Sequence, residues 1–169
     1  MNTTNPLQCG FAYAMAVKAK DDGRILTIDN AKNRVPLEGL NDMVTAYFKN
    51  GAGPANLYIG LWSGSHIPDG NETAATLASV VTEVTDYVQT GRLLLGLGSV
   101  TAGAASNAAD PARFDMLGSA TVNGAFISTV QTKGASTGKL LSVVRFANPR
   151  PVDASVYLEV LTGFQFVSL

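Results

Sequence analysis

A strict alternation of large and small residues near the start of the sequence limits what this chain can fold into. Residues 11–20, "FAYAMAVKAK", repeat with a period of two, which is typical of a β-strand with one buried face. The large residues on one side are Phe11, Tyr13, Met15 and Val17. "DDG" at 21–23 supplies a tight turn and "RILTI" at 24–28 a returning strand. The segment predicts an N-terminal β-hairpin, followed by a polar linker at 29–34.

Strand-like segments recur through the second half of the chain, separated by breaks that carry Gly, Ser, Asn or Pro. They cover approximately residues 92–97, 112–117, 120–129, 139–147 and 155–168. Several short strands at this spacing are typical of a β-sandwich or barrel. We therefore predict a mainly β protein with a jelly-roll-like sandwich or barrel.

One segment departs from the period of two and predicts a short helix. From Pro36 the apolar residues fall three to four positions apart, and Asn50-Gly51 ends the pattern. We expect this helix to pack on the sheet through Leu37, Leu40, Val44 and Phe48. "NLYIGLW" at 56–62 has two apolar faces, which predicts a central strand covered on both sides. The sequence does not decide whether a second short helix forms around residues 72–79.

Charge and hydropathy argue against two classes of partner. The net charge is −1 and the pI is about 5.7, so the chain lacks the broad basic surface that binds nucleic acid phosphates. The longest apolar runs, such as "LLLGLG" at 93–98, are far shorter than the ~20 residues that cross a bilayer. We predict neither nucleic acid nor membrane as a partner.

Cys9 and the N-terminal sequence bear on where the protein is made. Cys9 is the only cysteine, which excludes an intrachain disulfide and a multi-thiolate metal site. The opening "MNTTNPLQCG" has neither a basic start nor an apolar block, so no signal peptide is visible. Both observations fit synthesis in a reducing cytoplasm.

A search for catalytic groups finds no convincing constellation. His66 is the only histidine, and Ser63 or Ser65 with Asp69 would complete a Ser-His-Asp set within a single loop. A triad needs rigid presentation, so we expect an exposed loop histidine instead. Acidic pairs are explained as solvated surface groups; they are Asp21 with Asp22, Glu38 with Asp42, and Glu83 with Asp86. The oxygen-bearing residues around Asp110 lack a calcium-loop pattern. We predict no enzyme activity, no catalytic residues, no metal site and no cofactor.

Aromatic residues offer the remaining candidate site. Tyr47, Phe48, Tyr58 and Trp62 cluster around the predicted helix and the strand after it. Exposed rings would stack on sugars, whereas the same spacing also suits core packing. We favour core packing.

Five segments follow one another in an informative order. They are "VPLEGLNDMV", "NLYIGLWSG", "NETAATLASV", "GRLLLGLGSV" and the run from "VNGAFISTVQTKGASTGKLLSVVRF" to "VYLEVLTGFQF". In this order they resemble small tailed-phage virion proteins encoded near capsid genes, and within that group the capsid cement (decoration) proteins of short-tailed phages. The resemblance covers roughly residues 34–169, and "PLEGLN", "YIGLW" and "TKGASTGKLLSVVRF" are its most specific parts.

The resemblance implies a jelly-roll-like fold and a structural role on the capsid exterior, with the major capsid protein as partner. Residues 1–33 lie outside it, so we divide the chain into an N-terminal arm and hairpin extension (1–33) and a sandwich domain (34–169). We assign inter-subunit contact to the arm and to the hairpin after it, the latter through Phe11, Tyr13, Met15, Val17, Ile25 and Ile28. The alternative is that the hairpin forms an extra sheet layer on the same domain. A dimer or trimer suits symmetric lattice positions.

The composition agrees with such a role. Charged residues make up 15% of the chain, against about 25% in typical domains, and small residues are abundant. Wide, weakly charged surface suits contact with several protein neighbours. Two other functions are left open. One is a head fibre or tail protein that binds a host receptor or glycan through Tyr58, Trp62 and the loop 63–71, and the other is a cell-wall hydrolase centred on His66.

Overall fold

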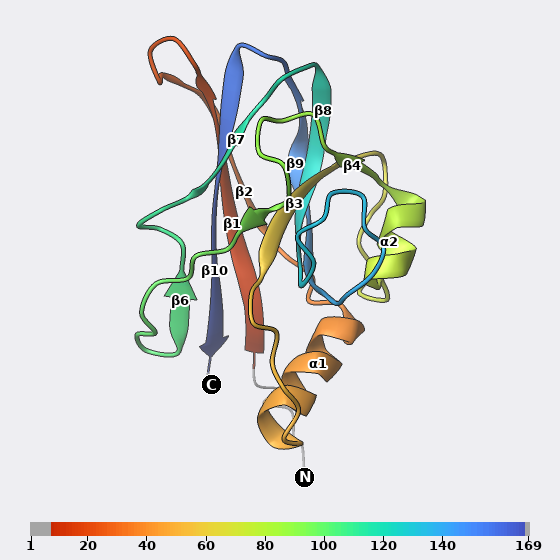
Figure 1. Cartoon of the computed structure of the whole chain (residues 1–169). Coiled ribbons are helices and arrows are strands. Elements are labelled where there is room, and N and C mark those ends of the chain that lie inside the picture. Colours follow the sequence, from red (N-terminus) through yellow and green to blue (C-terminus); the bar gives the residue numbers. More distant parts are fainter. Residues whose placement is uncertain (1–7, 168–169) are drawn as a thin grey trace.

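The computed structural model of the chain describes residues 8–167, which form ten strands and two helices (Figure 1). The strands are β1 (Gln8–Ala19), β2 (Ile25–Lys32), β3 (Tyr58–Ser63), β4 (Thr82–Val84), β5 (Leu93–Leu94), β6 (Ala104–Ser106), β7 (Ala112–Asp115), β8 (Ala120–Ser128), β9 (Leu140–Val152) and β10 (Val156–Val167). The helices are α1 (Leu37–Phe48) and α2 (Ala74–Val80). Neither of these two helices has the length and apolarity that a bilayer crossing requires.

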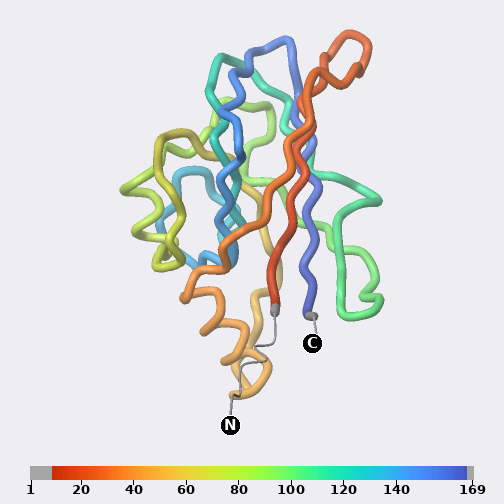
Figure 2. The backbone as a smooth tube through the Cα atoms, turned by 180° about the vertical axis from the view of Figure 1, so that it is seen from behind, coloured from red at the N-terminus to blue at the C-terminus, as the bar shows by residue number. Residues whose placement is uncertain are grey.

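The strands form two antiparallel sheets that pack face to face (Figures 1 and 2). The first sheet has the order β2-β1-β10-β6, with β7 also paired to β10. The second has the order β4-β3-β8-β9, with β5 also paired to β3. Large side chains from both sheets fill the space between them and are fully buried; examples are Met15, Leu61, Phe114, Ile127 and Leu158. The predicted β-sandwich is confirmed.

The predicted N-terminal hairpin is present, but it is not an extension of the domain. β1 pairs with β2 and, along its entire length, with β10. The division of the chain at residue 33 is therefore wrong, because β1 is an inner strand of the first sheet. β2 also continues through most of the predicted linker, where the buried Asp29 accepts hydrogen bonds from the Asn148 backbone N–H (3.3 Å) and from Arg150 (3.4 Å) on β9.

β3 is covered on both faces, as its two apolar faces predicted. Leu61 faces the space between the sheets, whereas Trp62 faces α2 and packs in a smaller apolar cluster with Leu77. α2 lies in the segment around residues 72–79, where the sequence did not decide whether a helix forms. Its first turn is closed by a reciprocal capping box between Thr73 and Thr76.

Two glycines in the second sheet make room for aromatic rings on the neighbouring strands. Gly60 on β3 pairs with Phe126 on β8, and Trp62 on β3 pairs with Gly124 on β8. A Cβ on Gly60 would overlap the Phe126 ring, and a Cβ on Gly124 would overlap the Trp62 ring. Each ring therefore occupies the space that a side chain on the neighbouring strand would need.

α1 is attached by the face opposite to the one expected. Gly39 is buried, and a Cβ there would lie 2.8 Å from the Cα of Leu141 on β9. Of the residues expected to pack on the sheet, Leu37, Val44 and Phe48 are exposed. That prediction is wrong, because a helix without a side chain at the contact approaches the strand backbone more closely than an apolar stripe would allow.

Replacing Gly124 with alanine should destabilise the fold strongly. The added Cβ would overlap both the Trp62 ring and the Val144 carbonyl oxygen, so strands or ring must move. We expect a loss of about 3 kcal/mol in the free energy of unfolding, measured by urea denaturation. Gly96→Ala is the matched control, since a Cβ there meets no atom within 4 Å. Equal stability of the two variants would contradict this packing.

Candidate functional site

The large β1 residues assigned to inter-subunit contact are buried in the core. Phe11, Tyr13, Met15 and Val17 expose no more than 5% of their surface. The Tyr13 hydroxyl donates to Ser142 Oγ on β9 (2.7 Å), and burial raises the pKa of this hydroxyl. This part of the predicted contact surface is wrong, because the alternation turns the large side chains toward the second sheet.

Ile25 and Ile28, the other two residues assigned to contact, are exposed on β2 together with Leu26. β2 is an outer strand of the first sheet. Exposed apolar side chains on an outer strand are typical of a place where another chain docks. These two residues stay in the predicted contact surface, whereas residues 1–7 of the arm lie outside the described residues.

Small side chains from β1 form the central row of the outward side of the first sheet. We call this surface the outer sheet face; it comprises Ala12, Ala14 and Ala16 on β1, Ile28 and Asn30 on β2, and Leu161 on β10. It lies between Lys32 at one end and the Lys18–Glu159 ion pair (2.5 Å) at the other. Sequence reasoning missed the alanines, although the same period of two that marked the large residues also marks them as the opposite face.

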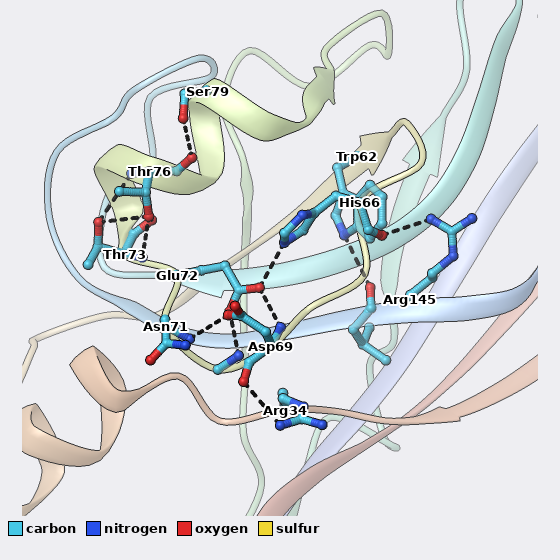
Figure 3. Close-up of polar contacts among 12 residues, drawn as sticks. Arg34, Trp62, His66, Asp69, Asn71, Glu72, Thr73, Thr76, Ser79 and Arg145 are labelled. Carbon is cyan, nitrogen blue, oxygen red and sulfur yellow. Dashed lines mark hydrogen bonds and ion pairs between the residues drawn. The ribbon is translucent and has the colours of Figure 1, made fainter.

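The loop between β3 and α2 is the second candidate region (Figure 3). Its centre is Glu72, a buried carboxylate that accepts hydrogen bonds from the backbone N–H groups of Asp69 (2.8 Å) and Gly70 (2.9 Å). His66 Nε2 lies 2.7 Å from Glu72 Oε1. The loop thus folds around one acidic side chain.

Two arginines hold the backbone of this loop from outside (Figure 3). Arg34, just before α1, donates to the Asp69 carbonyl oxygen (3.0 Å). Arg145 on β9 donates to the carbonyl oxygens of His66 (2.8 Å) and Gly64 (3.1 Å). His66 is therefore a half-buried residue of a fixed loop, which corrects the expectation of an exposed histidine.

The structure does not assemble the Ser-His-Asp set considered from the sequence. His66 pairs with Glu72, while the Asp69 carboxylate accepts from the Asn71 backbone N–H (2.8 Å). Within residues 8–167, no hydrogen bond joins the His66 side chain to Ser63 or Ser65. The imidazole instead holds the loop together through its contact with Glu72.

The aromatic cluster divides into buried and exposed members. Trp62 is fully buried and donates its indole N–H to the Val144 carbonyl oxygen (3.1 Å), so core packing is confirmed for this residue. Tyr47 and Phe48 are exposed, so core packing is wrong for them. A glycan platform that uses Trp62 is excluded by its burial.

Glu72 should make the stability of the fold depend on pH. Burial alone raises the pKa of Glu72, but the contact with His66 and the backbone donors outweigh it and lower this pKa below its ordinary value. The ionised Glu72 side chain stabilises the fold fully at pH values above the ordinary pKa of a glutamate side chain, about 4.3. It is lost as the pH falls through the lower pKa of the folded protein.

We expect Glu72→Gln to destabilise the fold by about 2 kcal/mol at neutral pH, and the difference from wild type to shrink toward pH 3. Urea denaturation at a series of pH values measures it. Asp110→Asn, which changes an exposed carboxylate, is the control. The expectation fails if Glu72→Gln and wild type lose stability in parallel on acidification.

Arg92 is the most extensively bonded buried charge in the described part of the chain. Its guanidinium donates twice to Glu83 (2.8 and 2.9 Å), and also to Ser128 Oγ (3.0 Å) and the carbonyl oxygens of Val130 (3.1 Å) and Ala135 (2.9 Å). These bonds use all five N–H donors and fix the 129–138 loop. The cavity of about 320 Å³ beside it therefore offers no free guanidinium donor to an anion.

Arg92→Ala should cost about 3–5 kcal/mol in the free energy of unfolding, because it leaves the Glu83 carboxylate without its cationic partner and the Ala135 carbonyl oxygen without the Arg92 donor. Denaturant unfolding measures the loss, and limited proteolysis should show faster cleavage in the 129–138 loop. Arg24→Ala breaks an exposed pair with Asp22 (3.8 Å) and should cost less than about 1 kcal/mol. Similar losses in the two variants would contradict a structural role for Arg92.

Other acidic residues considered for catalysis have structural contacts. Glu38 accepts hydrogen bonds from the backbone N–H groups of Ala74 (2.9 Å) and Leu140 (2.8 Å), which joins α1 to α2 and β9. Within residues 8–167, no group of three or more His, Cys, Asp or Glu side chains is placed to hold a metal ion.

Comparisons of this chain with protein-family models, with curated proteins and with solved structures found no match.

Proposed function

We propose that this protein is a phage virion structural protein of the capsid cement (decoration) kind. It binds the outside of the major capsid protein lattice and stabilises that lattice, after synthesis in the host cytoplasm. The observation that carries the proposal is the outer sheet face, which offers small and apolar side chains over several strands.

The chemistry of this face suits broad contact with protein. Alanine side chains let another surface approach the sheet closely, and exposed Ile25 and Ile28 extend the apolar area to the outer strand. A face of this kind gains affinity from area and shape rather than from a few strong polar groups. On a shell, many identical sites multiply a modest affinity through avidity.

Capsids that lack the protein provide the test. Purified protein should bind them at a fixed stoichiometry and raise the temperature at which they rupture. Ala14→Arg places a long charged side chain in the middle of the outer sheet face and should weaken binding at least tenfold, about 1.4 kcal/mol.

Ala75→Arg is the matched control, since Ala75 is exposed on α2, which covers the second sheet. Circular dichroism should show that both variants are folded. Absence of binding by the wild type would defeat the proposal, and equal binding by the two variants would exclude the outer sheet face as the contact.

A further inference from the structure

α1 presents its apolar side to solvent. We call this side the α1 stripe; it comprises Leu37, Leu40, Val44, Tyr47 and Phe48. Leu37 and Val44 are 56% and 53% exposed, and Tyr47 and Phe48 are 84% and 73% exposed. An amphipathic helix on a single domain normally turns this side inward. Here Gly39 on the opposite side makes the contact with β9, so the stripe has no partner among residues 8–167.

The spacing of the α1 stripe fits another helix. Leu37, Leu40, Val44 and Tyr47 follow one another at intervals of three, four and three residues. This is the spacing of the positions that interlock when two helices pack side by side. The Tyr47 and Phe48 rings contact each other edge to face, with centroids 5.0 Å apart, and widen the C-terminal end of the stripe.

The position of α1 leaves room for a partner. In both views the helix extends past the end of the two sheets (Figures 1 and 2). A helix of twelve residues is about 18 Å long, which is the length over which a partner helix would contact it.

Area and charge favour a second copy of this chain as the occupant. A large aromatic side chain has a surface area of about 150–250 Å². With the exposed fractions of its side chains, the α1 stripe offers roughly 400–500 Å² of apolar surface. Two facing stripes would bury about 800–1,000 Å², near the lower limit for a specific but weak dimer. No member of the stripe is charged, so two identical stripes face each other without repulsion.

We propose that the α1 stripe is a dimerisation surface, on which α1 of a second copy packs antiparallel about a two-fold axis. The antiparallel arrangement sets the N-terminal end of each helix beside the C-terminal end of the other, which is favourable for the two helix dipoles. A two-fold contact is also closed, so it yields a dimer rather than a chain of copies. The dimer leaves the outer sheet face free, and it does not depend on the proposed role on the capsid.

Sedimentation equilibrium of the full-length protein, from micromolar to near-millimolar concentration, tests the proposal. The wild type should show a concentration-dependent dimer. Val44→Glu should raise the dimer dissociation constant at least about a hundredfold, because it places two like charges in the contact. Val100→Glu makes the same change at another exposed valine and should leave dimerisation unchanged.

A mixing experiment tests the antiparallel pairing. Val44 lies near the middle of α1, so it lies close to its own copy in such a pair. Val44→Lys alone should also be monomeric, and mixing it with Val44→Glu should restore the dimer. A wild type that stays monomeric would overturn the proposal, as would a dimer that survives Val44→Glu or a mixture that stays monomeric. Loss of capsid binding in Val44→Glu without any wild-type dimer would assign the stripe to the capsid protein instead.

Discussion

The contact of Trp62 with Gly124 and Val144 fixes the arrangement of the second sheet, of α2 and of the loop that holds Glu72. The ring lies over the glycine of β8, and its N–H bonds to the backbone of β9, so one side chain joins three strands. α2 packs over the same ring through Leu77. The loop that holds Glu72 begins two residues after Trp62, and Arg145, which holds that loop, is the residue after Val144. The sheet, the helix and the loop therefore share one anchor.

Much of the fold could be predicted because burial leaves a regular trace in the sequence. The period of two identified β1 and its hairpin, and the two apolar faces of β3 indicated a covered strand. The strands β8, β9 and β10 also lie where the sequence placed them. β6 was not predicted, since its residues, Ala104–Ser106, are too small to leave a pattern. The hairpin was assigned to an extension because its pairing with β10 is a long-range contact that no local pattern reveals.

The candidate surfaces were harder to predict, because an apolar pattern shows which residues share a face but not which way that face points. In β1 the large residues turn inward and the alanines outward, whereas in α1 the large residues turn outward because Gly39 makes the contact. The same reasoning therefore assigned buried residues to contact and exposed ones to the core. The bonds of Arg92 and Glu72 join residues far apart in the chain or in irregular loops, which periodicity does not describe.

The pairing of β1 with β10 also bears on synthesis in the cell. β1 leaves the ribosome well before β10, its neighbour in the sheet, because most of the sandwich lies between them in the chain. At typical rates of translation, roughly ten seconds separate the two. During this interval the edge of β1 that pairs with β10 has no partner strand, so a nascent chain is open to wrong strand pairing until β10 emerges.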